Sequence, residues 1–505
     1  MCGHAPGDGP IVLNHPVSSS LVASHRKSVI VIGGGIAGLT AAYALRRQAT
    51  EAGLPLDCTV LEAVPAWGGK IVTHHVGELV MEAGPDSFLS QKPWALQLCE
   101  QLGLGGELIN TNPMEKKAFV FSRGRLHELP EGLVTFVPHQ LGPFLRSGLL
   151  SWRGLARMGL DLVIPRRRSE DDESLAAFFR RRFGWEAFER VMEPLMAGIH
   201  AGDAEQMSLR ATFPRFHELE QHHGSVIRGM MATRKARGQA GASTAPIRTM
   251  FVTLRHGLSD LVVALVDHLK KNGVVLRSGV RAAALRVRSH QLGRWMYDVV
   301  CDDGTAMAAD ALVLAIPAYA AADLVRPLSP LAAGLLEEIP YASTATLSLV
   351  YEARELAVRL EGSGFVVPRV EGRDLLAATW TSLKWPHRAS PEDVSVRCYV
   401  GGVGREAILQ QDDELLIRRV REELRSMAGI GATPRYVEVN RWERGMPQYL
   451  IGHAERVGGV DAAMSRFSGL VLAGAAYRGV GIPDCIKDGT AAATELVEYL
   501  RRPAP

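Results

Sequence analysis

A glycine-rich segment with G-x-G-x-x-G spacing offers the clearest chemistry in the chain; it comprises Gly33, Gly34, Gly35, Ile36, Ala37 and Gly38. In this spacing Gly33 permits a tight turn, Gly35 lets a pyrophosphate approach the backbone, and Gly38 lets a helix pack closely on a strand. Glu62 closes the next apolar run, where a carboxylate can accept hydrogen bonds from ribose hydroxyls and disfavours a 2′-phosphate. The pattern therefore predicts a dinucleotide site.

The site requires a strand before the turn and a helix after it. Residues Ser28–Ile32 are apolar and rich in β-branched side chains, Leu39–Gln48 has a helical pattern, and Asp57–Leu61 reads as a second parallel strand. The helix would present unpaired N–H groups to the phosphates. Ser28–Leu45 carries no charge over nearly the length of a membrane helix, but its glycines favour the nucleotide turn instead.

Composition indicates an ordinary globular protein. A chain of 505 residues with 47% hydrophobic residues suggests two or three domains. A net charge of +3 is too small to indicate that the protein binds nucleic acid. The six cysteines form no C-x-x-C pair, so neither a disulfide framework nor a metal site is indicated. Residues 1–26 read as a flexible extension rather than a signal peptide, and we expect a cytoplasmic protein.

The number of dinucleotide motifs bears on the reaction. Gly402–Ala407 nearly repeats the fingerprint, but Arg405 and Glu406 lie in its turn and no acid-tipped apolar strand follows, so we reject it. An NAD(P)H-fed reductase needs a second such site, and a disulfide reductase needs a C-x-x-C pair. We therefore expect FAD as cofactor, with electrons that come from a bound organic substrate and leave to oxygen or another acceptor.

Several segments carry a family resemblance; they are Glu62–Lys70, Glu82–Phe88, Glu193–Asp203, Ser208–Pro214 and Tyr477–Cys485. Together they resemble the flavin-containing amine oxidase superfamily, and specifically its protoporphyrinogen oxidase branch. The resemblance covers residues 27–500. It implies an α/β and α+β fold: a discontinuous Rossmann-like FAD-binding domain, a mixed-sheet substrate domain and an all-helical, membrane-associating insertion.

The expected division of the chain follows the pattern of strands and helices. We assign 27–110, 247–318 and 437–505 to the FAD-binding domain, 111–130 and 319–436 to the substrate domain, and 131–228 to the helical insertion. Residues 229–246 are small, basic and flexible in composition and are expected to form a mobile loop.

The resemblance implies oxidation of a porphyrinogen, protoporphyrinogen IX or coproporphyrinogen III, to the porphyrin in haem biosynthesis, with O2 as acceptor and H2O2 as product. It carries FAD contacts over to the glycine-rich segment and to Glu62, Ala63, Gly69, Lys70, Gly84, Pro85, Asp86, Ser87, Val280, Trp442, Val480, Gly481 and Ile482. Because the cofactor performs the hard step, we assign no catalytic acid or base. An amine oxidase, a carotenoid desaturase and a non-catalytic flavin-binding protein stay open as alternatives.

Cations are needed for the propionates of such a substrate. The candidates are Lys92, Arg123, Arg125, Arg210 and Arg215. Asp86 stands where some family members carry Arg, and the loop that contains it looks more like bacterial members that accept coproporphyrinogen. The preference between the two porphyrinogens and the oligomeric state stay open.

Two arginine clusters flank the helical region, Arg166–Arg168 and Arg180–Arg182. Such clusters usually form a solvated face, but beside apolar helices they can also hold a domain against an anionic membrane surface. The family resemblance favours the second interpretation, which would place the protein at the periphery of a membrane.

Overall fold

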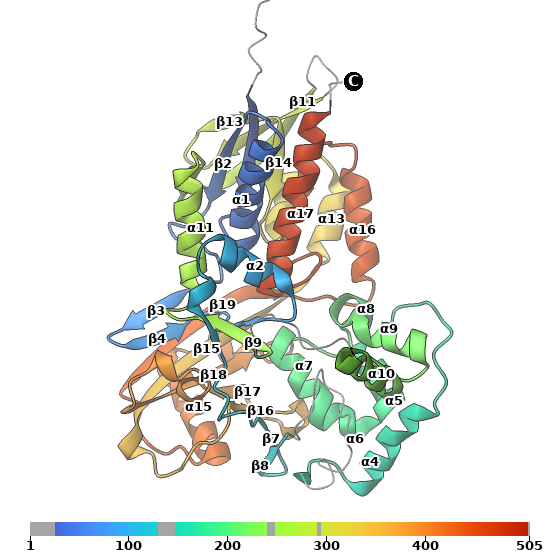
Figure 1. The fold of residues 1–505 in the computed structure, drawn as a ribbon, viewed down its shortest axis with the longest axis vertical. Coiled ribbons are helices and arrows are strands. Elements are labelled where there is room, and N and C mark those ends of the chain that lie inside the picture. The colour runs from blue at the N-terminus through green and yellow to red at the C-terminus, as the bar shows by residue number, and fades with distance from the viewer. Residues whose placement is uncertain (1–25, 130–146, 240–247, 290–293, 503–505) are drawn as a thin grey trace, which may run out of the picture.

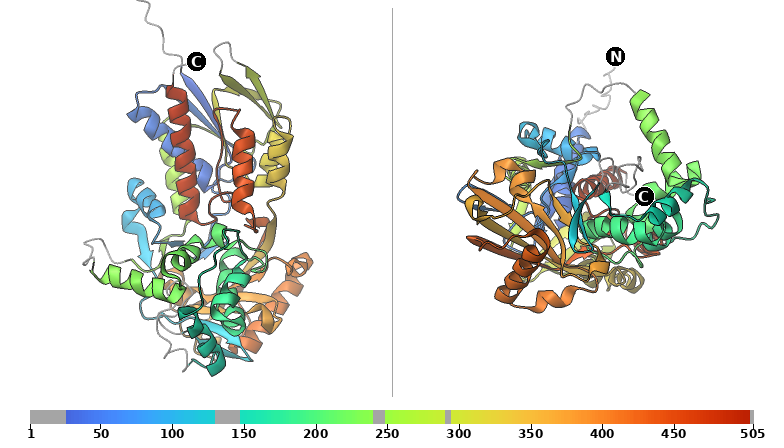
Figure 2. Two further views of the ribbon diagram at one scale, coloured as in Figure 1. Left: turned by 90° about the vertical axis from the view of Figure 1, so that its right-hand side faces the viewer. Right: turned by 90° about the horizontal axis from the view of Figure 1, so that it is seen from below.

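The computed structural model describes residues 26–129, 147–239, 248–289 and 294–502. A five-stranded sheet covered by helices forms one end of the molecule, and a seven-stranded sheet forms the other (Figure 1). A group of helices lies beside the second sheet, as the turned views show (Figure 2). The extension expected at residues 1–26 lies outside the described residues except for Arg26.

The five-stranded sheet is entirely parallel and is assembled from distant parts of the chain. Its order is β10 (Val275–Ser278), β2 (Leu56–Glu62), β1 (Lys27–Ile32), β14 (Ala311–Leu314) and β20 (Leu470–Leu472). Val29 and Val31 of β1 enter one core while Ile30 and Ile32 enter another, so both faces are buried. The predicted discontinuous nucleotide-binding sheet is therefore present.

Helices and a small sheet cover the two faces. One core contains α1 (Ile36–Glu51), α2 (Pro93–Gln101), α11 (Ser259–Lys271) and α17 (Ile482–Arg501). The other contains α12 (Ala318–Val325), α13 (Pro330–Glu337), α16 (His453–Met464) and an antiparallel sheet of β11 (Ala282–Ser289), β12 (Trp295–Cys301) and β13 (Ala306–Ala309). A Cβ at Gly489 would lie 2.3 Å from the Ala37 carbonyl oxygen, so glycine permits the close packing of α17 on α1.

The seven-stranded sheet is mixed. Its order is β19 (Tyr436–Pro447), β15 (Tyr341–Glu352), β18 (Asp393–Gly401), β17 (Leu375–Trp380), β16 (Gly364–Val366), β7 (Phe119–Ser122) and β8 (Arg125–Glu128), with only β16 and β7 parallel. The amphipathic helix α15 (Asp413–Ala428) packs its apolar side against one face. The other face points toward the nucleotide-binding half.

Short elements join the two halves. They are the hairpin of β3 (Thr73–Val76) and β4 (Leu79–Glu82), and the sheet of β5 (Phe88–Leu89), β9 (Phe251–Leu254) and β6 (Leu108–Asn110), with the 3-10 turn η1 (Gly105–Glu107) just before β6. The helix α14 (Thr381–Lys384) and the 3-10 turns η5 (Ala353–Glu355), η6 (Arg369–Glu371), η7 (Pro386–Arg388) and η8 (Glu406–Gln410) follow strands of the seven-stranded sheet in the chain. Because β5 and β6 both pair with β9, residues before and after the helical insertion meet in one sheet.

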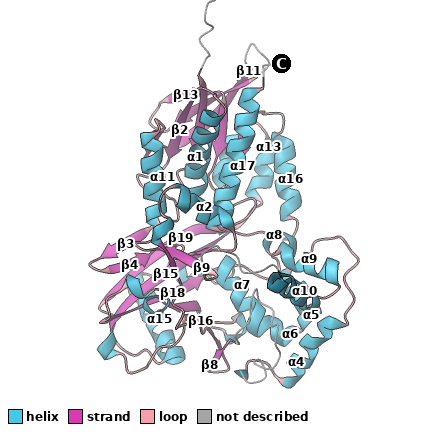
Figure 3. Cartoon of the chain, in the orientation of Figure 1, coloured by secondary structure: helices cyan, strands magenta, loops and turns pink. Residues whose placement is uncertain are grey.

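The insertion between β8 and β9 consists of helices in its described part (Figure 3). They are α4 (Trp152–Gly159), η3 (Leu160–Leu162), α5 (Leu175–Phe183), α6 (Trp185–Ala187), the π-helical turn η4 (Phe188–Met192), α7 (Glu193–His200), α8 (Leu209–Thr212), α9 (Pro214–His223) and α10 (Val226–Gln239). Ser174 caps α5 as predicted, since its hydroxyl accepts a hydrogen bond from the Ala177 N–H. Residues 131–146, expected to be part of the helical insertion, lie outside the described residues.

Three expected boundaries are corrected by the structure. Residues 229–239, expected as a loop, continue α10, while 240–246 lie outside the described residues. The first residues assigned to the last FAD-binding segment form β19, an edge strand of the seven-stranded sheet. Helices α12 and α13, assigned to the substrate domain, pack on the nucleotide-binding half. Amino-acid composition indicated where helices and strands could end, but it could not show which sheet a strand would join.

None of the helices in the described parts of the chain combines the length and apolarity needed to cross a lipid bilayer.

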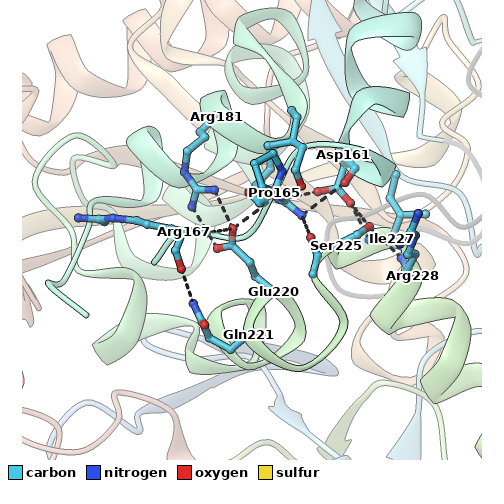
Figure 4. Close-up of polar contacts among 12 residues, drawn as sticks. Asp161, Pro165, Arg167, Arg181, Glu220, Gln221, Ser225, Ile227 and Arg228 are labelled. Carbon is cyan, nitrogen blue, oxygen red and sulfur yellow. Dashed lines mark hydrogen bonds and ion pairs between the residues drawn. The ribbon is translucent and has the colours of Figure 1, made fainter. Parts of the chain in front are cut away.

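The second arginine cluster is part of the core of the insertion rather than a solvated face. Arg182 is fully buried; its Nε lies 2.6 Å from Asp161 and its NH1 lies 3.6 Å from Glu220. Arg181 joins Glu220 to Glu173. Figure 4 shows how Asp161 and Glu220 gather these contacts together with Arg167 and Ser225. The sequence hypothesis of a basic surface at Arg180–Arg182 was therefore wrong.

We expect Arg182→Met to lower the free energy of unfolding by about 3–5 kcal/mol, because it leaves the Asp161 carboxylate buried without its cation. Urea denaturation followed by tryptophan fluorescence would report it, since Trp152 and Trp185 lie in the insertion. Arg168→Met is the matched control, because Arg168 is exposed, and it should change stability by less than about 0.5 kcal/mol. Equal effects of both substitutions would contradict the assigned role.

Candidate functional site

The glycine-rich turn between β1 and α1 leaves space where a phosphate group is expected. Gly33 has φ +111°, which only glycine adopts readily, and a Cβ at Gly38 would lie 1.9 Å from the Gly33 carbonyl oxygen. By contrast, a Cβ at Gly35 would meet no heavy atom within 4 Å. Gly35 is also the N-cap of α1, so open space adjoins unpaired helix N–H groups.

Glu62 ends β2 beside this turn. Its Oε2 accepts a hydrogen bond from the Gly34 N–H at 2.6 Å, and its Oε1 accepts one from the Val64 N–H at 3.0 Å. The Val280 N–H donates to the backbone carbonyl of Glu62 at 2.9 Å, while Ala63 is exposed alongside. The structure thus brings Glu62, Ala63 and Val280, three of the residues expected to contact FAD, together at the edge of the turn.

A second backbone segment lies against the glycine turn. The Gly68 N–H donates to the Gly34 carbonyl at 2.9 Å, and Gly35 and Gly68 form a parallel bridge. Gly69 follows at φ +61°, and Lys70 is accessible to solvent. Desolvation by the surrounding protein lowers the pKa of Lys70.

The Gly84 loop follows β4 and closes on this segment. A Cβ at Gly84 would lie 1.8 Å from the Lys70 carbonyl oxygen, so only glycine fits there. The neighbouring carbonyl of Ala83 accepts hydrogen bonds from Trp442 Nε1 at 3.0 Å, Thr346 Oγ1 at 2.9 Å and an Arg397 NH2 at 3.1 Å. Residues of the seven-stranded sheet therefore hold the loop against the nucleotide-binding half.

Asp86 directs its carboxylate away from the glycine turn. It pairs with Lys384 at 2.8 Å and accepts hydrogen bonds from Trp385 and Ser87. Burial raises the pKa of Asp86, but the charges of Lys384, Arg397 and Arg388 outweigh this effect and hold it well below its usual range. The side chain that stands where some family members carry Arg is thus part of an internal ion cluster.

The N-terminus of α17 reaches the same region. Gly481 is its N-cap, and Pro483 occupies its first turn as predicted. The Tyr449 hydroxyl donates to the Ala475 carbonyl at 2.6 Å and accepts from the Gly479 N–H at 2.8 Å, which fixes the turn that leads to Val480. Two helix N-termini, those of α1 and α17, therefore adjoin the site and favour negative charge there.

The five cations proposed for propionates do not form one group. Lys92 lies near the site, but its Nζ is 2.6 Å from Asp484 Oδ2. Arg123 pairs with Glu186 and Arg125 contacts His127, both at the β7–β8 turn. Arg210 on α8 donates to the Glu170 carbonyl. Arg215 belongs to α9. Only Lys92 of the five therefore lies near the loops at residues 33–38, 68–70 and 84–87, whereas the other four lie on other elements.

The near-fingerprint at Gly402–Ala407 is not a second nucleotide turn. It follows β18, which is antiparallel to both neighbours, and it leads into the short turn η8 instead of a crossover helix. Its rejection on sequence grounds is confirmed.

Comparison with known proteins identifies the family. Residues 36–497 match the family described as flavin containing amine oxidoreductase. The chain belongs to this family. It is 38% identical over 476 residues to a coproporphyrinogen III oxidase of Bacillus subtilis, with 94% of this chain and 99% of that protein covered. It is 30% identical to a chloroplastic protoporphyrinogen oxidase of Spinacia oleracea over 93% of this chain and 84% of that protein.

Solved structures agree with this assignment. A protein from Exiguobacterium sp. 255-15, assigned as a protoporphyrinogen oxidase, superimposes with a TM-score of 0.80 at 31% identity and covers 94% of this chain and 99% of its own. Putrescine oxidase structures superimpose with TM-scores near 0.66 at 14% identity, which shows the shared fold alone. The cofactor of the chain is accordingly a flavin, as the single dinucleotide site predicted.

The sequence analysis did not predict one face of the seven-stranded sheet. This face points toward the loops at residues 68–70 and 84–87, here called the flavin-side loops. On β18, Val396, Cys398 and Val400 pack into the core beneath α15, so Arg397 and Tyr399 occupy the opposite face. Their partners there are Thr379 and Ala377 on β17. The alternation of apolar and polar residues in β18 can be seen in the sequence and predicts that the strand has two different faces. It does not indicate which part of the molecule the polar face contacts.

We expect Gly35→Val to fold and to purify without flavin. The added side chain meets no protein atom and the backbone has φ −73°, which any residue adopts, so the substitution fills only the space left for the phosphates. The ratio of flavin absorbance to protein absorbance measures the loss. Gly53→Val is the matched control; its φ of +62° strains the chain, but it lies away from the turn and should keep the flavin. Full flavin occupancy in the Gly35 variant would contradict the site.

Proposed function

We propose that this chain is an FAD-dependent oxidase that converts a porphyrinogen to the porphyrin in haem biosynthesis. The observation that carries the proposal is the sheet face opposite the Gly84 loop, in a chain of which 94% and 93% match relatives named for the oxidation of coproporphyrinogen III and of protoporphyrinogen. On this face Thr379 and Tyr399 are half-buried, whereas Arg397 is only 3% exposed because it donates to the carbonyls of the Gly84 loop. Thr379 and Tyr399 therefore offer the side chains against which a flat substrate would lie beside the flavin.

The residues present fit FAD. We propose that the pyrophosphate adjoins Gly33, Gly34, Gly35, Ile36, Ala37 and Gly38, that the adenosine half adjoins Glu62, Ala63 and Val280, and that the ring adjoins Gly69, Lys70, Gly84, Pro85, Asp86, Ser87, Trp442, Val480, Gly481 and Ile482. The open space at Gly35 and the N–H groups of α1 support the first assignment. When bound, FAD takes hydride equivalents from the substrate and passes the electrons to O2, which becomes H2O2.

The residues of the chain supply orientation and electrostatics. The N-terminus of α17 would stabilise negative charge at the ring edge, and Lys70 would add a cation beside it. Asp86 contributes through its backbone, because its carboxylate is paired with Lys384. Because the flavin would carry out the oxidation and the protein would orient the substrate, no carboxylate or imidazole is assigned as a general acid or base.

The substrate we favour is coproporphyrinogen III. It carries four propionates, whereas protoporphyrinogen IX carries two propionates and two apolar vinyl groups, so it requires cations around more of the ring. The relative named for coproporphyrinogen III is 38% identical to this chain, against 30% for the spinach protoporphyrinogen oxidase. An alternative as an amine oxidase with flavin attached through Cys485 is disfavoured, because burial raises the pKa of that thiol to about 12.

We expect the purified protein to oxidise both porphyrinogens in air without NAD(P)H, to release peroxide, and to show a kcat/KM for coproporphyrinogen III about tenfold higher, as one or more additional charge-assisted hydrogen bonds would produce. Porphyrin fluorescence measures each rate. The Gly35→Val protein serves as the flavin-free control. A large preference for protoporphyrinogen IX would overturn the choice of substrate, and turnover of neither would overturn the proposed reaction.

We also propose that the helical insertion contacts an anionic membrane surface. Trp152 on α4, Val163 after η3 and Trp185 on α6 are 71%, 73% and 61% exposed, and their elements pack on one another. Arg166 and Arg168 are exposed on the segment that follows Val163. Exposed aromatic side chains beside arginines suit insertion at the level of lipid headgroups.

We expect vesicles that contain anionic phospholipid to sediment the protein, and the double substitution Trp152→Ser with Val163→Ser to abolish sedimentation. Arg166→Glu with Arg168→Glu should weaken it strongly, because each cation near the surface contributes about 1 kcal/mol. Val263→Ser, on α11 and 56% exposed, is the control for an exposed apolar residue elsewhere. Binding that survives both double substitutions would refute the proposed surface.

A further inference from the structure

A shallow, partly open depression lies where the helical insertion meets the seven-stranded sheet; its empty space of about 240 Å³ includes the solvent at its mouth. Glu193, at the start of α7, and Ala201 and Gly202, just after it, form one side. Gly401, Arg369 and Arg405 contribute the other. The Val403 N–H donates to the Ala201 carbonyl at 2.9 Å, which joins the two sides below the depression.

The depression has an excess of one positive charge. Glu193 is only 8% exposed, accepts a hydrogen bond from the Arg369 N–H at 3.2 Å, and lies 3.8 Å from Arg369 Nε. This contact and a hydrogen bond from Arg369 NH2 to the Val403 carbonyl hold the Arg369 guanidinium in place. Two arginines and one carboxylate therefore face the same small space.

Arg405 has no acidic partner within ion-pair distance among the described residues. Burial lowers the pKa of Arg405, and the nearby positive charge of Arg369 lowers it further. A half-buried guanidinium beside another cation is electrostatically unfavourable. A bound anion would remove this repulsion and provide the acceptors that the planar donor group lacks.

The depression lies on the same sheet face as the flavin-side loop. Arg397 of β18 donates to the carbonyls of Ala83 and Gly84, and Tyr399 and Gly401 follow on the same face. Four residues along a strand cover roughly 13 Å. A tetrapyrrole laid along this face from the Gly84 loop would carry its side arms over a comparable distance, with Tyr399 beneath the ring.

We propose that Arg405 and Arg369 bind a carboxylate side arm of the substrate in this depression and so place the ring along β18. The inference rests on the proposed function and deepens it. A monocarboxylate matches the single excess positive charge, whereas a phosphate dianion would leave negative charge beside the buried Glu193.

The test compares Arg405→Met and Arg405→Lys with Arg418→Met, which removes a charge from the exposed side of α15. Two measurements are made on the flavin-loaded proteins in detergent: kcat and KM with coproporphyrinogen III, and the dissociation constants of coproporphyrin III and of its tetramethyl ester by fluorescence. Flavin absorbance and circular dichroism verify that each variant is folded.

We expect Arg405→Met to raise KM and the dissociation constant of the tetra-acid at least about tenfold, to change kcat little, and to leave the ester unaffected. Arg405→Lys should fall between wild type and Met, because it keeps the charge but loses the paired donors. Arg418→Met should match wild type. Unchanged KM and unchanged acid binding in both Arg405 variants would overturn the inference, as would equal losses for acid and ester. Absence of turnover in the wild type would instead defeat the proposed function.

Discussion

The architecture depends on how the segment from Glu82 to Ser87 is held between the two halves of the molecule. The buried Arg388 guanidinium bonds Glu82 at 2.8 Å, Lys384 pairs with Asp86, and three donors converge on the Ala83 carbonyl. Each of these donors belongs to the seven-stranded half, whereas Glu82 belongs to the hairpin beside the nucleotide sheet. Breaking one buried pair costs about 3–5 kcal/mol, because it leaves the other charge unpaired. The relative placement of the flavin-side loop and the sheet face is therefore set by charge pairing inside the protein and does not wait for a ligand.

Local signals allowed the nucleotide-binding half to be predicted in some detail. The strand, turn and helix around Gly33 to Gly38 lie next to one another in the chain, and the close contact that requires glycine at position 38 is made with Gly33 of the same turn. Glu62 at the end of β2 and the start of α17 after Gly481 were also predicted from local sequence signals. Where the chain returns from a distant part, as β19 does, the prediction placed the strand in the wrong half. Pairing with β15 depends on register over long sequence separation, which composition does not encode.

Charged residues were the hardest to interpret from sequence. A run such as Arg180–Arg182 looks uniform, yet one member is fully buried between Asp161 and Glu220, another joins Glu173 to Glu220, and the third stacks on Trp185. Whether an arginine is held in an internal ion pair or is free to bind a ligand depends on acidic residues elsewhere in the chain, such as Asp161 and Glu220. The same limitation explains why Lys92, which pairs with Asp484, was predicted to bind a propionate, and why the depression lined by Arg369 and Arg405 was not predicted.

The two ends of the proposed site recognise negative charge by different physical means. Phosphates are expected at backbone N–H groups of helix N-termini, whose orientation is fixed by the helices themselves, so few cationic side chains are needed there. Carboxylate side arms have no such partner on a sheet face and require guanidinium groups. Arg397, the cation nearest the Gly84 loop, already donates to backbone carbonyls and is not available for that purpose. Just beyond the end of β18, Arg405 has no acidic partner within ion-pair distance among the described residues, so a substrate anchored there would be positioned by its periphery. Its ring could then present successive carbons to the flavin while one side arm stayed bound.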